Sequence, residues 1–183
     1  MKKNNKTQIR KWIYSAICLT LCMVLPFLTG QLQQMGNALC PMHIPVLLCG
    51  FLCGAPYGAL VGAVAPILRF FLFGMPVLFP MGTAMSFELA AYGFLAGFLY
   101  HRLPKKPVNI YITLLIAMTG GRMIWGIVRW GMALFFGVEF SVEMFLSGAF
   151  LTAIPGILCH IILIPIMVLA LQRAGLVIGM EKG

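Results

Sequence analysis

Charged residues, and acidic ones above all, are what this sequence has least of. Only 9% of its 183 residues are charged, and four acidic side chains stand against 13 lysines and arginines. Soluble domains carry about 25% charged residues, and disordered chains combine high charge with low hydrophobicity. The composition, which is 61% hydrophobic, excludes both classes and predicts a membrane protein with several spans.

Catalytic and nucleotide-binding motifs are also missing. The sequence has no His-Glu-x-x-His, Gly-x-Ser-x-Gly or Walker pattern. It has no aspartate either, which excludes an intramembrane aspartyl protease and argues against proton-relay pumping. The six cysteines lack the Cys-x-x-Cys spacing of zinc sites, so we expect them to pack as small apolar side chains. We therefore predict a protein that is not an enzyme, has no metal or cofactor, and draws transport energy from partners.

The apolar runs predict an all-α domain of six membrane-spanning helices. A helical span needs about 20 mainly apolar residues, so the second run is short for a full crossing. The last run is broken by Pro155 and Pro165. The six spans are expected at 12–28, 42–53, 56–73, 81–100, 108–137 and 144–171.

Basic residues at the ends of these runs predict the orientation. Five lie within 1–11, three within 102–106 and two near the C-terminus, while the predicted outer loops carry none. By the positive-inside rule both termini are cytoplasmic. The expected organisation is a basic N-terminal segment 1–11, a six-helix bundle 12–173 and a tail 174–183. This distribution explains the net charge of +9 without nucleic acid.

Three arginines lie inside apolar runs, where a charge costs at least about 2.5–3.5 kcal/mol. They are Arg69, Arg122 and Arg129, and the predicted spans supply one acid, Glu88. Arg122 and Arg129 are seven residues apart, so they share a helix face. Counting from the outer ends of the spans places Glu88 at the depth of Arg129. A Glu88–Arg129 pair is therefore expected, which leaves Arg122 without an acid at its own level.

This excess of buried positive charge has two interpretations. The arginines could hydrogen-bond backbone carbonyls or snorkel to the surface, and snorkelling suits Arg69. Alternatively they line an outward-open pocket for an anionic small molecule, because guanidinium groups bind carboxylates in a bidentate manner. Other candidates for such a pocket are polar or aromatic, and a structural role stays open for them. They are Asn37, His43, Trp125 and His160.

Small residues recur at intervals of four along three of the predicted spans. Such faces let helices approach closely. They predict tight packing within the protein or, alternatively, a surface that slides against another membrane protein. The positions are Gly50, Gly54, Gly58 and Gly62, then Gly93 and Gly97.

Several short motifs follow one another between residues 40 and 93. They are the Met-His-Ile-Pro-Val-Leu-Leu run within 40–50, Gly-Ala-Pro-Tyr-Gly at 54–58, Ala-Pro at 65–66, and the stretch 74–93, which opens with Gly-Met-Pro and ends with Phe-Glu-Leu-Ala-Ala-Tyr-Gly. In this combination and order they resemble the substrate-binding S components of bacterial energy-coupling factor (ECF) vitamin transporters. The size and six-span layout extend the resemblance over residues 10–172.

The resemblance implies a multi-pass protein of the bacterial cell membrane that binds a vitamin with high affinity near the outer face. It implies three partner subunits, namely a transmembrane coupling subunit and two ATPases, in a complex where the S component topples to release its cargo. It also implies a small-residue face on the first helix for docking the coupling subunit. The nearest match here is the pair Ala16 and Thr20.

The same motifs are similar to those of pantothenate-type S components. Pantothenate carries one carboxylate, which one arginine could clamp while Glu88, His43 and Asn37 engage its hydroxyls and amide. Folate-like ligands and queuosine precursors are alternatives, and a neutral planar ligand would use Trp125 and Glu88 more than Arg122. Outside transport, the alternative is a membrane scaffold protein whose arginines are structural.

Overall fold

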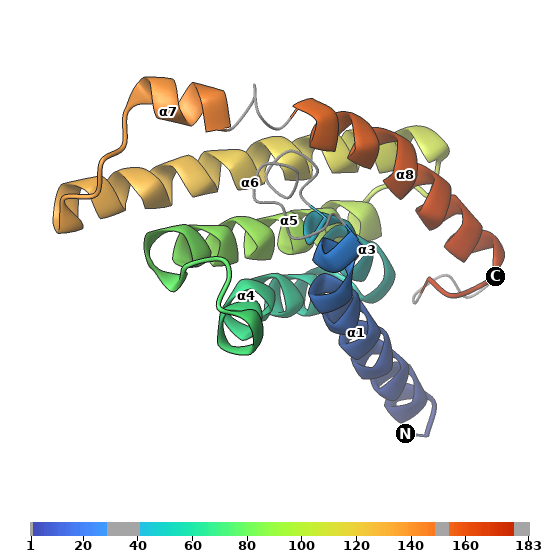
Figure 1. Ribbon diagram of the computed structural model, residues 1–183. Helices are drawn as coiled ribbons and strands as arrows, with labels where there is room; N and C mark the ends of the chain where they lie inside the picture. Colours follow the sequence, from blue (N-terminus) through green and yellow to red (C-terminus); the bar gives the residue numbers. More distant parts are fainter. Residues whose placement is uncertain (1, 29–40, 149–153, 178–183) are drawn as a thin grey trace.

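The computed structural model describes residues 2–28, 41–148 and 154–177, and helices joined by short turns make up these ranges (Figure 1). Four of them, α1, α4, α6 and α8, are long and apolar enough to cross a membrane. The prediction of an all-α, multi-span membrane protein is therefore confirmed. The elements are α1 (Lys2–Leu28), α3 (His43–Cys53), α4 (Ala55–Phe73), the wide turn η1 (Leu78–Gly82), α5 (Thr83–Arg102), α6 (Pro107–Phe136), α7 (Val142–Leu146) and α8 (Ile154–Arg173).

The helix bounds follow the predicted spans except near the two chain ends. α1 begins at Lys2, so the basic N-terminal segment continues the first span as one helix. Within the predicted span 144–171 the structure has α7, which ends at Leu146, and α8, which starts at Ile154, and residues 149–153 between them lie outside the described ranges. Pro155 is the second residue of α8 as described, and Pro165 lies inside that helix.

Six crossings stay a prediction, because two of the corresponding helices are not among the four span candidates. α3 has only 11 residues. α5 has 20 residues, but Glu88 and several small or polar side chains lower its mean hydropathy. α3 is nevertheless buried among neighbouring helices. α5 buries one face against its neighbours, while Phe87, Phe94 and Phe98 are exposed on another.

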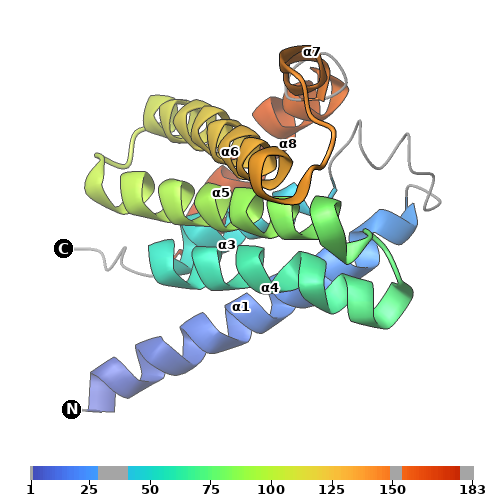
Figure 2. The same ribbon diagram turned by 90° about the vertical axis from the view of Figure 1, so that its left-hand side faces the viewer.

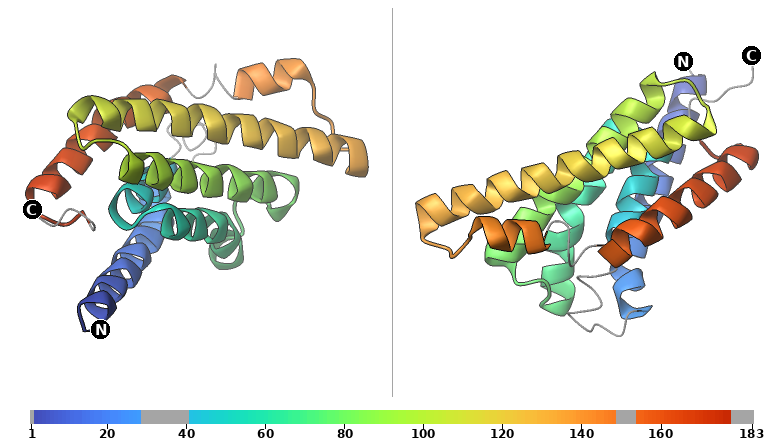
Figure 3. Two further views of the ribbon diagram at one scale, coloured as in Figure 1. Left: turned by 180° about the vertical axis from the view of Figure 1, so that it is seen from behind. Right: turned by 90° about the horizontal axis from the view of Figure 1, so that it is seen from above.

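Successive long helices run in alternating directions through the bundle. The start of α1, the α3–α4 junction, the α5–α6 turn and the end of α8 therefore gather at one end, called here the terminal end (Figures 2 and 3). Side chains join the helices there: the hydroxyl of Tyr57 donates to Gln8, and the amide of Gln172 donates to Tyr100. The path thus brings the two described ends of the chain to the same side.

The short helix α3 occupies the centre of the bundle. It contacts α1, α4, α5 and α8, and ten of its 11 residues are buried. A helix that is apolar all round belongs in such a position. Its last residue is followed by Gly54, whose φ of 97° turns the chain into α4 and favours glycine.

Glycines set the distance between α4 and α5. A Cβ at Gly58 would lie 2.5 Å from the carbonyl oxygen of Gly93, and a Cβ at Gly50 would approach the same oxygen equally closely. Only glycine permits this approach, so the small-residue rows pack α3, α4 and α5 together, as one of their two interpretations predicted. This packing fixes α5, which carries Glu88, against the start of α3, which carries His43.

Candidate functional site

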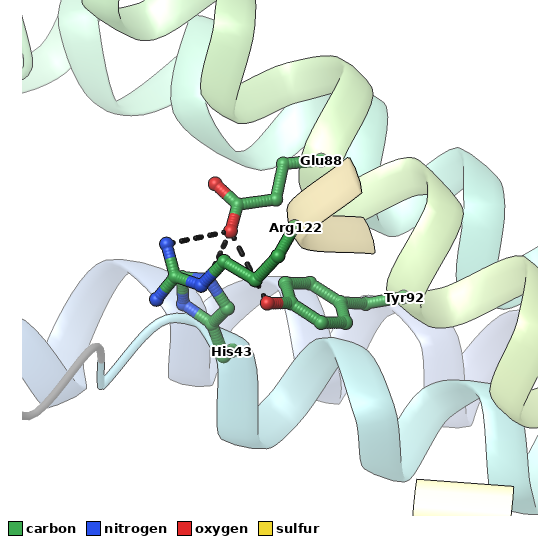
Figure 4. A network of polar contacts seen from close by, with 4 residues as sticks. All are labelled: His43, Glu88, Tyr92 and Arg122. Atoms are coloured by element: carbon green, nitrogen blue, oxygen red, sulfur yellow. Dashed lines mark hydrogen bonds and ion pairs between the residues drawn. The ribbon is translucent and has the colours of Figure 1, made fainter. Parts of the chain in front are cut away.

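Glu88 of α5 and Arg122 of α6 form an ion pair inside the bundle. Arg122 Nη1 lies 2.9 Å from Glu88 Oε1, and the two side chains are 13% and 2% exposed (Figure 4). A buried carboxylate needs a partner of this kind, because the loss of its hydration is otherwise uncompensated. The pair therefore brings together two of the residues that the sequence proposed for a pocket.

This pairing corrects the expectation that Glu88 faces Arg129. Glu88 lies 14 residues before Arg102, the last residue of α5, and Arg122 lies 15 residues after Pro107, the first residue of α6. Counting from the short α5–α6 turn therefore puts Glu88 and Arg122 at one level. Counting from the other end failed because α6 has 30 residues and projects past the start of α5 (Figure 1).

Two further side chains contact the same oxygen of Glu88. The Tyr92 hydroxyl donates to Oε1 at 3.2 Å, and His43 Nε2 lies 3.6 Å from it. Figure 4 shows the three contacts meeting at this oxygen, while the other carboxylate oxygen, Oε2, points away from them. We call Glu88, Arg122, Tyr92 and His43 the polar cluster. It joins α3, α5 and α6 at one point.

Sequence reasoning missed Tyr92, although a signal for it was present. Tyr92 follows Glu88 by four residues, a spacing that places two side chains on the same helix face. Its ring also packs edge-on against His43, with 5.0 Å between the ring centroids. Tyr92 thus fixes the positions of both neighbours.

A small cavity adjoins the polar cluster. Four polar side chains line it, namely His43, Tyr92, Arg122 and His160, together with apolar residues of α3, α6 and α8. About 10 Å³ of it is open to the centres of water-sized molecules, which is room for about one water. His160 reaches the cavity from α8, with its ring 5.9 Å from that of His43. Three of the predicted site residues, namely His43, Arg122 and His160, therefore line one cavity.

Arg129 and Trp125 lie on α6 further from the terminal end than the polar cluster. The Arg129 guanidinium carbon lies 5.1 Å from the centre of the Phe140 ring, and its Nε is buried without a hydrogen-bond partner in the described ranges. Trp125 contacts Phe140 and Phe145, with ring centroids 5.6 and 6.2 Å away. We call Trp125, Phe140 and Phe145 the aromatic layer. The sequence had suggested only Trp125.

Arg69 lies apart from the polar cluster and does not line the cavity. Its Nη1 donates to the carbonyl oxygen of Met23 at 3.1 Å, which joins α4 to α1. Its guanidinium also lies over the rings of Phe27 and Phe73, at 5.6 and 5.4 Å. At 6% exposure it does not snorkel, contrary to expectation. Hydrogen bonding to a backbone carbonyl, the other structural interpretation, is what the structure shows for this residue.

The remaining predicted residues lie outside the cavity or outside the described ranges. Asn37 belongs to the second group. Ala16 and Thr20 lie on an exposed face of α1, where the Thr20 hydroxyl donates to the Ala16 carbonyl oxygen at 3.0 Å. Their exposure leaves them accessible to another protein, and their docking role stays a prediction.

Buried cysteines lie between α1 and α3. Cys49 donates to the Ser15 hydroxyl at 3.6 Å, and Cys53 donates to the Lys11 carbonyl oxygen at 3.7 Å. Within the described ranges no three His, Cys, Asp or Glu side chains form a group able to hold a metal ion. The thiols therefore pack as small apolar groups with weak hydrogen bonds.

Apolar helices that bury an ion pair and two histidines beside a cavity define a multi-span membrane protein with an internal polar site. Residues 10–175 match the family described as "ECF transporter, substrate-specific component", and the chain belongs to that family. It is thus a non-catalytic, substrate-binding subunit of an ECF transporter in the membrane. No curated protein and no solved structure showed significant similarity to the chain.

Proposed function

We propose that the chain binds a small water-soluble vitamin at the polar cluster, with pantothenate as the candidate, for ATP-driven uptake with an ECF module. The convergence of Glu88, Arg122, Tyr92 and His43 beside a cavity carries this proposal. Ionisable groups inside a membrane are costly and mark ligand pathways more often than structural joints. Their meeting at one point on three helices supports a binding role in a family of substrate-binding subunits.

The chemistry of the polar cluster suits pantothenate. This vitamin has hydroxyl groups and an amide, which both donate and accept hydrogen bonds, and a carboxylate, which requires a cation. Glu88 accepts hydrogen bonds, Arg122 and Tyr92 donate them, and an imidazole such as that of His43 does either. Because the cavity has room for only about one water, the surrounding side chains must move apart to admit the vitamin.

A neutral planar ligand is the second candidate, and the Glu88–Arg122 pair favours it. Because Glu88 balances the charge of Arg122, the ion pair has no net charge to offer an anion. A folate-like ring or a queuosine precursor presents neighbouring donors and acceptors that match a carboxylate. Such a ring could also stack on Trp125, which already contacts two aromatic side chains.

Ligand identification tests the proposal directly. The full chain is purified in mild detergent, any small molecule that co-purifies is identified by mass spectrometry, and pantothenate is titrated by tryptophan fluorescence. Arg122→Ala should weaken binding by about 2–5 kcal/mol, the cost of removing one partner from a buried charged contact. Arg173→Ala is the matched control, because Arg173 is exposed at the end of α8. If the wild type neither retains nor binds pantothenate, the proposal that pantothenate is the ligand is wrong.

A further inference from the structure

Resting on the proposed function, we infer that the ligand is two-ended and that its orientation is fixed. Its uncharged, hydrogen-bonding end contacts His43 and the Glu88–Arg122 pair. Its anionic group is bound by Arg129, near the aromatic layer. The two arginines of α6 therefore have different roles: Arg122 belongs to the protein's own ion pair, and Arg129 selects for a negative charge.

The ion pair excludes an anion from the end of the site at the polar cluster. Arg122 Nη1 lies 2.9 Å from Glu88 Oε1, and Glu88 is almost fully buried. A ligand carboxylate at Arg122 would compete with Glu88 and place a second negative charge beside it in a medium of low dielectric constant. A hydroxyl or amide brings no such charge, so an uncharged group fits this end.

His43 provides the unmet hydrogen bonds that such a group would satisfy. It is 4% exposed and lines the cavity, yet neither ring nitrogen has a hydrogen-bond partner within the described ranges. Buried polar atoms normally have partners, and each exception calls for an explanation. The Oε2 atom of Glu88 points away from the three contacts made by Oε1. A hydroxyl in the cavity could bond to the imidazole of His43.

Arg129 has the opposite character. It forms no ion pair within the described residues, and its buried Nε has no hydrogen-bond partner there. It lies seven residues beyond Arg122 on the same face of α6, which is about 10 Å along the helix axis. Among the described residues, no carboxylate therefore lies within ion-pair distance of its guanidinium, whereas Glu88 pairs with that of Arg122.

The spacing of the two arginines matches the length of pantothenate. About eight covalent bonds separate its terminal hydroxyl oxygen from its carboxylate carbon, which is about 10 Å in an extended chain. The carboxylate would then reach Arg129 while the terminal hydroxyl reaches the polar cluster. The middle of the molecule, which carries two methyl groups and the planar amide, would pass Trp125, whose ring already packs against Phe145.

Paired ligands test this orientation on the purified full chain. Panthenol is the probe that replaces the carboxylate of pantothenate with an alcohol at nearly the same length. The wild type should bind pantothenate at least about 30-fold more tightly than panthenol, the ratio expected for one buried charged contact. Arg129→Gln should abolish this preference by weakening pantothenate alone. Arg129→Lys keeps the positive charge and should retain part of the preference for pantothenate over panthenol. This variant also provides a test if Arg129→Gln does not fold.

Two further variants complete the test. His43→Phe should weaken both ligands by the same factor and leave their ratio unchanged. The double variant Glu88→Gln/Arg122→Gln should also leave the ratio unchanged, because it removes both charges of the pair together. If the double variant removes the preference, or Arg129→Gln keeps it, the carboxylate is not bound at Arg129 and the inference is wrong while the vitamin assignment stands. If the wild type does not bind pantothenate, both are wrong.

Discussion

One oxygen of Glu88 accepts hydrogen bonds from both Arg122 and Tyr92, so the three side chains cannot be replaced independently. Each residue alone would be a buried polar group in an apolar bundle. Together they satisfy one another, and the ring nitrogens of His43, which have no hydrogen-bond partner within the described ranges, leave hydrogen-bonding capacity beside the cavity. At the scale of residues the polar cluster is thus both a structural joint between α5 and α6 and a place where a ligand can bond.

A double-mutant cycle should reveal this dependence. Arg122→Met alone should destabilise the protein by about 3–5 kcal/mol, because it leaves Glu88 buried without a cation. Adding Glu88→Leu should recover much of this loss, since the double variant buries no charge. The measurement is thermal unfolding in detergent, monitored by tryptophan fluorescence. Additive effects of the two substitutions would show that the pair contributes no coupling.

Not every residue of the polar cluster could be found from the sequence. Glu88 and Arg122 were identifiable because charges are rare in apolar runs. The pairing of Glu88 with Arg122 could not be predicted, because it depends on how far α6 projects past α5. The apolar runs alone do not specify that length. Tyr92 carries only the weaker signal of its spacing, four residues after Glu88, since aromatic side chains are ordinary constituents of membrane helices.

At the scale of elements, the site depends on how closely α3, α4 and α5 approach. α3 is too short to cross a membrane alone, and its burial is possible because glycines bring α4 and α5 against it. The apolar runs and the position of Gly54 allowed α3, α4, α5 and α6 to be predicted.

Replacing Gly93 should separate α4 from α5. A Cβ at Gly93 would meet the backbone of Gly58, which cannot move aside as a flexible side chain could. Gly93→Ala should therefore cost about 1–3 kcal/mol of stability, the usual effect of overpacking. Gly131→Ala is the matched control, because a Cβ at Gly131 of α6 meets nothing within 4 Å.

That control should be neutral or stabilising by about 0.5–1 kcal/mol, because alanine favours the helix over glycine. Thermal unfolding in detergent measures both variants under the same conditions. Equal unfolding temperatures for Gly93→Ala and Gly131→Ala would contradict the role given to the α4–α5 contact.

At the scale of the whole molecule, the protein is a binding subunit with little mass outside its helices. The described ranges are almost entirely helical, and the family it belongs to is non-catalytic. The start of α1 and the end of α8 lie at the terminal end (Figure 3). Along the bundle, the polar cluster lies between the terminal end and the opposite end of α6. The sequence carries no Walker motif for binding a nucleotide.

Uptake should consequently require the partner subunits. Cells that produce the chain alone should not accumulate labelled pantothenate against a gradient, whereas cells that also produce a coupling subunit and two ATPases should. The comparison is made with an ATPase variant unable to hydrolyse ATP, which separates binding at the cell surface from transport. Concentrative uptake by the chain alone would contradict this prediction.

The placement of the Glu88–Arg122 pair also bears on how the protein enters the membrane. The two charges lie at nearly equal distances from the short α5–α6 turn, so they meet within one hairpin of consecutive helices. Inserted alone, α5 would bring an unpaired carboxylate and α6 unpaired guanidinium groups into lipid, each at a cost. Inserted as a hairpin, they cancel the charges of Glu88 and Arg122 before any other helix packs against them. We therefore expect α5 and α6 to enter the membrane together, with the contact between Glu88 and Arg122 formed at that step.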